Sequence, residues 1–126
     1  MMKTVIKTEG APNPIGPYNQ AILTNNTLYI SGQIAIDPAT GKLISGDARD
    51  QTIRVMKNLE AILIAAGLDF LNVVKSSIMV TNLDHFAQVN EAYGSFFKSD
   101  PPARETLQAS KLPLNSEVEI SMIAVK

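Results

Sequence analysis

The segment Pro101–Thr106 places one arginine, Arg104, shortly after two prolines. Proline lacks a backbone N–H and clashes with the preceding helical turn, so a helix cannot continue through this segment. The alternation that follows predicts a strand over residues 104–110. A guanidinium is permanently charged and planar, and it matches a carboxylate in geometry. We expect a small organic acid to dock at Arg104; the alternative is a solvated charge or a surface ion pair.

Strand parity adds a carboxylate and a hydroxyl to this candidate site. In the predicted strands 27–33 and 117–125, Ser31 and Glu119 lie opposite the core, and parity assigns Arg104 to the same side. Such a set can form a small-molecule site. A partly desolvated Glu119 would have a raised pKa and can transfer protons. The alternative is that Glu119 and Arg104 form a structural ion pair.

A constrained loop presents a further hydroxyl. Residues 9–18 contain three prolines and two glycines and end at Tyr18. This composition predicts a loop with a restricted backbone. Tyr18 either lines a site or packs over the edge of the core.

The elements that position these residues can be read from periodicity and turn signals. Asn25-Asn26 suits a two-residue hairpin turn, because asparagine tolerates positive φ. Asp47 caps a helix that ends before Gly67, and Asp84 is expected to cap a second helix that ends near Lys98. The apolar stripe of the first helix comprises Ala48, Thr52, Val55, Leu59, Ile62 and Ala66. The predicted strands are 4–7, 20–24, 27–33, 73–81, 104–110 and 117–125.

The order β-β-β-α-β-α-β-β predicts one α+β domain over residues 1–126. A helix between two strands implies a crossover and some parallel pairing, so the sheet should be mixed, with both helices on one face. In the third strand, Gln33 should lie opposite the core with Tyr29 and Ser31. The side facing the helices should carry Leu28, Ile30, Val74, Ile78, Val80, Leu107, Val118, Ile120, Met122 and Ala124.

The opposite face of the sheet mixes polar groups with Tyr29, Met79, Ile123 and Val125. A fully solvated face would not need these apolar residues. We therefore predict a homo-oligomer that buries this face.

Composition excludes several classes of function. The net charge is −1 and there is no cysteine, so neither a phosphate-attracting field nor thiolate chemistry is expected. The single histidine, His85, has no second metal ligand nearby in sequence, and we expect no metal site. No signal peptide or membrane span is recognisable, which predicts a cytoplasmic protein that binds neither nucleic acid nor membrane.

Several motifs together resemble the RidA/YjgF reactive-intermediate deaminases over essentially the whole chain. They are Ile15-Gly16-Pro17-Tyr18, Ser31-Gly32-Gln33, Ala65-Ala66-Gly67, Phe86-x-x-Val89-Asn90-x-x-Tyr93, Pro102-Ala103-Arg104 and Val118-Glu119-Ile120. The resemblance implies a chorismate-mutase-like fold, a homotrimer with sites at the subunit interfaces, and cofactor-independent hydrolysis. The implied substrates are 2-aminoacrylate and 2-aminocrotonate, which are converted to 2-keto acids and ammonia.

The resemblance also implies roles for individual residues. Arg104 would grip the substrate carboxylate, and Glu119 would activate the attacking water. Ser31 and Tyr18 would assist proton transfer. Gly32, Asn90 and Thr106 would line the substrate pocket.

Two positions depart from the family's pattern. Thr106 stands where members often carry cysteine, and Glu105 stands where the residue is often small. By parity Glu105 points away from Arg104; a carboxylate folded back onto Arg104 would compete with the substrate.

Two other functions remain open from the sequence. One is a trimeric regulatory protein that senses small keto acids without turnover. The other is an RNA-directed role, as described for some family members, which the charge does not favour.

Overall fold

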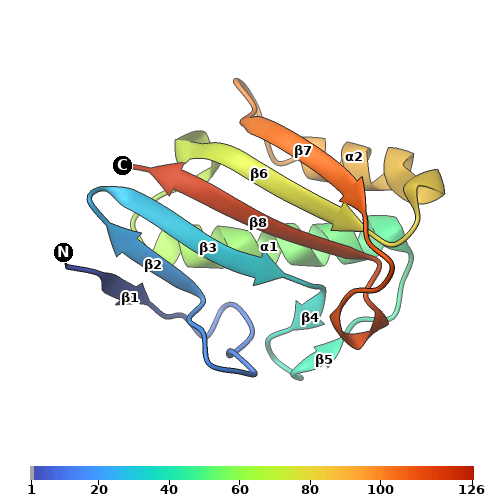
Figure 1. Cartoon of the computed structure of the whole chain (residues 1–126), viewed down its shortest axis with the longest axis horizontal. Coiled ribbons are helices and arrows are strands. Elements are labelled where there is room, and N and C mark those ends of the chain that lie inside the picture. The colour runs from blue at the N-terminus through green and yellow to red at the C-terminus, as the bar shows by residue number, and fades with distance from the viewer. Residues whose placement is uncertain (1) are drawn as a thin grey trace.

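The computed structural model describes residues 2–126, and six strands of these residues form one mixed sheet in the order β1-β2-β3-β8-β6-β7 (Figure 1). Neighbouring strands are antiparallel except β6 and β7, which are parallel. The strands are β1 (Thr4–Ile6), β2 (Ala21–Thr24), β3 (Thr27–Gln33), β6 (Val73–Val80), β7 (Ala103–Gln108) and β8 (Val118–Val125).

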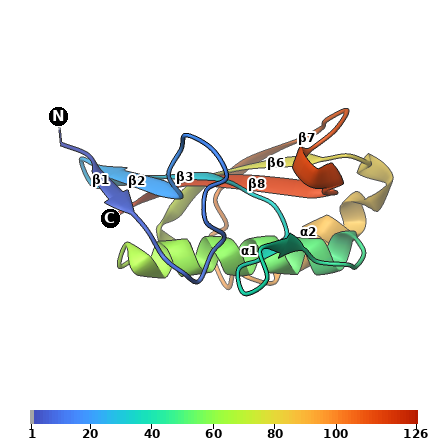
Figure 2. The same cartoon turned by 90° about the horizontal axis from the view of Figure 1, so that it is seen from below.

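Two helices, α1 (Ala48–Ala65) and α2 (Phe86–Gly94), lie on the same face of the sheet (Figure 2). Helix α2 forms the crossover between the parallel strands β6 and β7. The predicted α+β class, with a mixed sheet and both helices on one face, is therefore confirmed. No helix within residues 2–126 combines the length and apolar character needed to cross a membrane.

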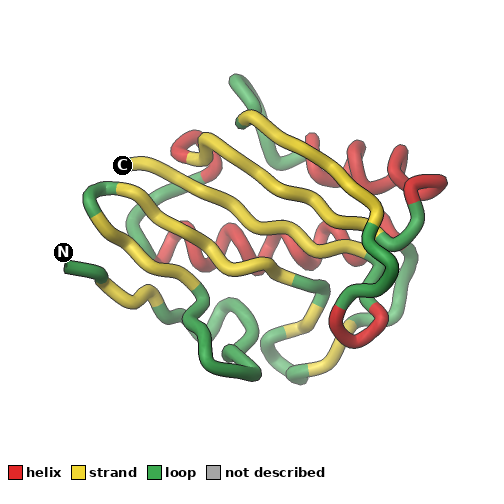
Figure 3. Tube along the Cα trace, viewed as in Figure 1, coloured by secondary structure: helices red, strands yellow, loops and turns green. Residues whose placement is uncertain are grey.

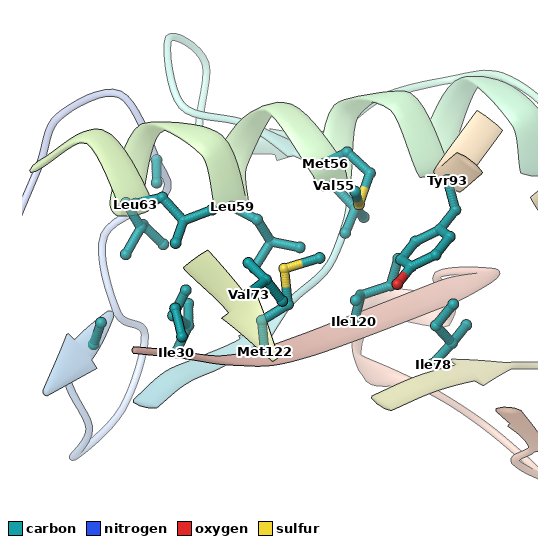
Figure 4. Close-up of a cluster of buried hydrophobic side chains, with 14 of the residues drawn as sticks. Ile30, Val55, Met56, Leu59, Leu63, Val73, Ile78, Tyr93, Ile120 and Met122 are labelled. Carbon is teal, nitrogen blue, oxygen red and sulfur yellow. The ribbon is translucent and has the colours of Figure 1, made fainter. Parts of the chain in front are cut away.

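The core lies between α1 and the central strands (Figure 4). Every residue of the predicted α1 stripe is buried, and Leu59 and Ile62 have no exposed surface. The Asp47 carboxylate accepts the N–H of Asp50 at 2.9 Å and caps the helix. Gly67, with φ of +76°, follows its end in the left-handed conformation. Local periodicity was sufficient to predict α1 because these signals agree.

The β2–β3 hairpin turns at Asn25 and Asn26, whose φ angles are +48° and +65°. Both residues thus adopt the positive φ that the Asn-Asn pair predicts. The structure adds a small separate hairpin, formed by β4 (Ile36–Asp37) and β5 (Lys42–Leu43) with a turn at residues 38–41. The loop 7–20, this hairpin and the segment 109–117 gather at one edge of the molecule (Figure 3).

Short 3-10 turns, η1 (Phe70–Asn72), η2 (Leu83–His85) and η3 (Pro113–Asn115), complete the chain. The second of them corrects a prediction. Asp84 is not the cap: the Asn82 side chain caps η2 by accepting the N–H of Asp84 at 2.9 Å, and α2 follows with no side-chain hydrogen bond at its own N-cap, His85. Helix α2 then begins only at Phe86 and ends at Gly94, four residues before the predicted end at Lys98.

The assignment of residues to sheet faces was wrong at three places. Val74 and Leu107 were predicted to face the helices, but each is 49% exposed, and the neighbouring Val73 is buried in place of Val74. A register irregularity between Val73 and Lys75 causes the first error. Another, between Ile30 and Gln33, accompanies the burial of Gln33, which is 6% exposed.

Candidate functional site

A hollow of about 400 Å³ lies where β3 and β8 meet the loop 7–20 and η3. Four of the predicted site residues line it: Tyr18, Ser31, Gly32 and Glu119. The rest of the wall is largely apolar and comprises Pro12, Asn13, Ile15, Gln20, Gln33, Ile34, Ile36 and Pro113. A mostly apolar cavity with a few convergent polar groups is typical of a small-molecule site.

Glu119 is half-buried at this hollow, on the sheet face opposite the helices. Burial raises the pKa of its carboxyl above the ordinary range, as the sequence predicts for a partly desolvated carboxylate. No ion pair joins it to Arg104 within residues 2–126, so the alternative of a structural bridge between the two does not hold in the subunit. A carboxyl with a raised pKa beside an open cavity is suited to proton transfer.

Gly32 makes room for this carboxylate. A Cβ atom at Gly32 would overlap Glu119 Oε2 and would lie 3.0 Å from Glu119 Cδ. Any larger residue at position 32 would therefore displace the carboxylate from the backbone of β3. Gly32 shapes the site by its lack of a side chain.

The two hydroxyls occupy the rim of the hollow. Ser31 Oγ donates to the carbonyl oxygen of Asn19 at 2.6 Å. Tyr18 is 46% exposed, and its hydroxyl accepts the N–H of Ile15 at 3.4 Å. Tyr18 therefore keeps its hydroxyl proton to donate, and Ser31 keeps oxygen lone pairs that can accept.

Gln20 was not predicted as a site residue, yet its amide supports the loop that carries Tyr18. Gln20 is 2% exposed, and Nε2 donates to the carbonyls of Thr8, Ala11 and Pro12. Its Oε1 accepts the N–H of Thr8 at 2.8 Å. The only available signal in the sequence was a polar residue at the start of a strand.

Arg104 lies on the other face of the sheet from Glu119, which corrects the parity prediction. Arg104 pairs with Ser76 and Thr106 with Ile78 along β6, and both of these β6 residues are buried under the helices. Glu119 instead pairs with Met79, on the open face. The prediction failed because β7 is an edge strand and most of its residues are exposed. Its sequence therefore shows no clear alternation between an apolar and a polar face.

The guanidinium of Arg104 rests against α2. Its Nη1 donates to Asn90 Oδ1 at 2.7 Å. Its central carbon lies 5.4 Å from the ring centre of Phe86 and 5.3 Å from that of Tyr93. Within residues 2–126 no carboxylate forms an ion pair with it. The structure thus joins two predicted substrate contacts, Arg104 and Asn90, in a second cluster separate from the hollow.

The two positions that depart from the family's pattern behave differently. Glu105 points away from Arg104, as predicted, and forms an ion pair with Lys75 at 2.9 Å and a hydrogen bond with Ser77. The contact with Lys75, followed by that with Ser77, lowers the pKa of Glu105. Thr106 lies on the Arg104 face, and its buried Oγ1 has no hydrogen-bond partner within the described residues. Glu105 is therefore held away from Arg104, while the Thr106 hydroxyl retains an unused donor.

Comparisons with known proteins agree on one family. The family model described as Endoribonuclease L-PSP matches residues 8–126. A human protein named 2-iminobutanoate/2-iminopropanoate deaminase is 44% identical over 100% of this chain and 92% of its own. A Yersinia pestis structure of the conserved Rid protein family superposes with a TM-score of 0.97 at 46% identity, over 99% of this chain and 100% of that one. Escherichia coli TdcF with bound serine superposes with a TM-score of 0.94 at 37% identity, over 98% of each chain.

The family match spans nearly the whole chain, including both clusters, and the human relative aligns with all of this chain. The chain therefore belongs to the RidA/YjgF family of reactive-intermediate deaminases.

Proposed function

We propose that the protein hydrolyses 2-iminopropanoate and 2-iminobutanoate, with their enamine tautomers 2-aminoacrylate and 2-aminocrotonate, to 2-keto acids and ammonia. We further propose a chorismate-mutase-like homotrimer in which the hollow of one subunit faces Arg104 and Asn90 of the next. The observation that carries this arrangement is the separation of the two clusters onto opposite faces of one sheet. A site that needs both clusters is complete only when a second copy supplies the missing half.

The open face of the sheet supports such an assembly. Tyr29 and Leu107 on this face are 50% and 49% exposed, and Met79 and Ile123 are half-buried between them in the sheet. Exposed apolar residues gathered on one sheet face indicate a protein–protein contact. Contact between such faces would bring subunits together next to the hollow, because Glu119 and Ser31 lie on the same face.

The proposed reaction needs an anchor and one proton carrier. Arg104 holds the substrate carboxylate through its free guanidinium edge, which orients the imine carbon toward the hollow. Glu119 takes a proton from water as its oxygen adds to that carbon, and it delivers this proton to the imine nitrogen, giving a carbinolamine. The same carboxylate then takes the hydroxyl proton and passes it to the amino nitrogen, so that the C–N bond breaks, the carbonyl forms and ammonia leaves.

The polar groups around Glu119 complete this proposal. Tyr18 and Ser31 relay protons at the rim, and Gly32 lets the carboxylate lie against the backbone of β3. Thr106, on the same face of β7 as Arg104, lines the substrate pocket next to the guanidinium. The raised pKa of Glu119 suits a group that must both take and give a proton.

A coupled assay tests the proposal. A threonine dehydratase supplies 2-aminocrotonate, and the release of 2-ketobutyrate is followed with and without this protein. We expect the wild type to accelerate release and Arg104→Ala to lose at least about tenfold of that acceleration, because a charge-assisted bidentate contact is removed. Arg49→Ala, which removes an exposed arginine paired with Glu91 at 2.6 Å, is the matched control and should remain active.

The alternative is a metabolite sensor with the same assembly. A sensor binds 2-ketobutyrate and accelerates nothing, so a folded wild type that binds the keto acid without turnover would reject the enzyme and favour the sensor.

A further inference from the structure

We infer that Phe86 and Tyr93 are positioning residues that hold the guanidinium of Arg104 in one orientation, ready for a substrate carboxylate. This inference deepens the proposed function and rests on it for the identity of the substrate. The alternative role of Phe86 and Tyr93 is structural: they would only pack helix α2 against the sheet.

The spacing on α2 creates the clamp. Phe86, Asn90 and Tyr93 are separated by four and three positions, so they share one face of the helix. Arg104 reaches this face from β7, and each ring centre lies less than 6 Å from the central guanidinium carbon. That distance is within the range of a cation–π interaction.

Tyr93 is itself fixed by the sheet below. It is 3% exposed, and its hydroxyl donates to the buried Ser76 Oγ at 2.9 Å. Burial raises the pKa of Tyr93, so the hydroxyl stays protonated. Figure 4 shows the Tyr93 side chain reaching from α2 toward Ile120 and Ile78 in the sheet. The ring against Arg104 therefore cannot swing away without breaking a buried hydrogen bond.

The clamp leaves part of the guanidinium free. Asn90 accepts from Nη1, and no other hydrogen bond to Arg104 occurs within the described residues. A guanidinium carries five N–H donors, so the remaining edge can bind a carboxylate in a bidentate manner. Aromatic rings hold the cation without offering a competing negative charge. Ordering a long arginine before the substrate arrives reduces the entropy lost on binding.

The discriminating substitution is Phe86→Leu, which keeps an apolar side chain but removes the aromatic face. Phe86 is half-buried, so this change preserves most of the packing. We expect KM to rise about threefold to tenfold with kcat within about twofold of the wild type, because uniform binding of the carboxylate is weakened. Phe86→Tyr restores the aromatic face and should restore KM. Phe96→Leu, at a half-buried ring that contacts Phe70 instead, is the control for general packing.

A second readout does not depend on turnover. The Nε–Hε group of Arg104, assigned by its loss in Arg104→Lys, should show restricted motion in ¹⁵N relaxation of the wild type and increased motion in Phe86→Leu. The dissociation constant for 2-ketobutyrate should rise by the same factor as KM. If the wild type has no turnover but Arg104 is rigid and Phe86→Leu frees it, the clamp stands and the enzyme proposal fails.

Two results would overturn the clamp. One is an unchanged KM and unchanged Arg104 motion in Phe86→Leu. The other is an equal effect of Phe96→Leu, which would mean that the rings act only through packing.

Discussion

The carboxylate of Glu119 occupies the space that a side chain at Gly32 would fill, since a Cβ there would overlap Oε2. Glu119 comes from β8 and Gly32 from the irregular end of β3, at the register shift between Ile30 and Gln33. The missing side chain of Gly32 and the position of the Glu119 carboxylate are thus two parts of one arrangement.

Gly32→Ala is expected to reduce imine hydrolysis about tenfold or more while leaving the protein folded. The methyl group must push the Glu119 carboxylate away, and small displacements of a catalytic group are costly. The coupled dehydratase assay measures the effect, and circular dichroism checks the fold. Gly94→Ala is the matched control: outside its chain neighbours and its own helix backbone, no heavy atom lies within 4 Å of the added Cβ. Gly94 is the last residue of α2, so this variant should fold and keep its activity unchanged. Full activity in Gly32→Ala would contradict the assigned role of Glu119.

The raised pKa of Glu119 makes a prediction about pH. Its folded-state pKa exceeds the unfolded value because burial disfavours the charged form, so its contribution to the free energy of unfolding is greatest at low pH. That contribution is lost as pH rises through the raised pKa. Urea denaturation from about pH 4 to pH 7 should therefore show a weaker pH-dependent loss in Glu119→Gln than in the wild type.

The pKa of Glu105 is shifted in the opposite direction to that of Glu119. Its pKa is lowered by Lys75 and then by Ser77, so its contribution is present above the unfolded pKa and is lost as pH falls through the lowered one. Glu105→Gln should remove stability preferentially at neutral pH, while Glu119→Gln should not. If both variants changed the pH profile in the same direction, the burial assigned to Glu119 would be wrong.

The cap of η2, the turn just before α2, gives a prediction on which the structure and the sequence pattern disagree. Asn82→Ala should lower the free energy of unfolding by about 1 kcal/mol, because its side chain accepts the N–H of Asp84. Asp84→Ala should cost less than about 0.5 kcal/mol, since only a favourable charge near the helix start is lost. Thermal or urea unfolding of the two variants decides between them. A larger loss in Asp84→Ala would restore Asp84 as the cap.

What the sequence could predict depended on how local the determining contacts are. Helix α1 was predictable because its stripe, its cap at Asp47 and its stop at Gly67 are all encoded within twenty or so residues. The Asn25-Asn26 turn was predictable for the same reason. Ser31 and Glu119 at the hollow followed from strand parity, because β3 and β8 are central strands with one clearly apolar face.

The errors in the predicted sheet faces arose where strand irregularities or contacts with distant elements, rather than simple alternation, determine the direction of a side chain. A one-residue shift in the register of a strand moves the side chains beyond it to the opposite face of the sheet. Such shifts leave Gln33 buried and Val74 exposed. On the edge strand β7 the apolar Leu107 faces the open side, while Arg104 faces α2. The aromatic contacts of Arg104 come from a helix that precedes it in the chain, and no spacing within β7 indicates them.

Mixed assemblies test whether the two clusters of one site come from different subunits. Glu119→Gln and Arg104→Ala should each be inactive alone, because each removes one half of every site. When the two variants are co-expressed and assemble at random, a site formed across an interface can combine the intact hollow of one with the intact arginine of the other. About one site in four should then be complete, and about a quarter of wild-type activity should return.

The control for this experiment pairs Glu119→Gln with Gly32→Ala. Both substitutions alter the hollow, so every subunit in the mixture carries a defective hollow, and activity should stay low. If Glu119 and Arg104 served the same site within one chain, the first mixture would stay as inactive as the second. That result would reject the site between subunits, because mixing cannot repair a site in which both residues belong to one subunit. Recovery in the first mixture alone requires that the carboxylate and the guanidinium come from neighbouring copies.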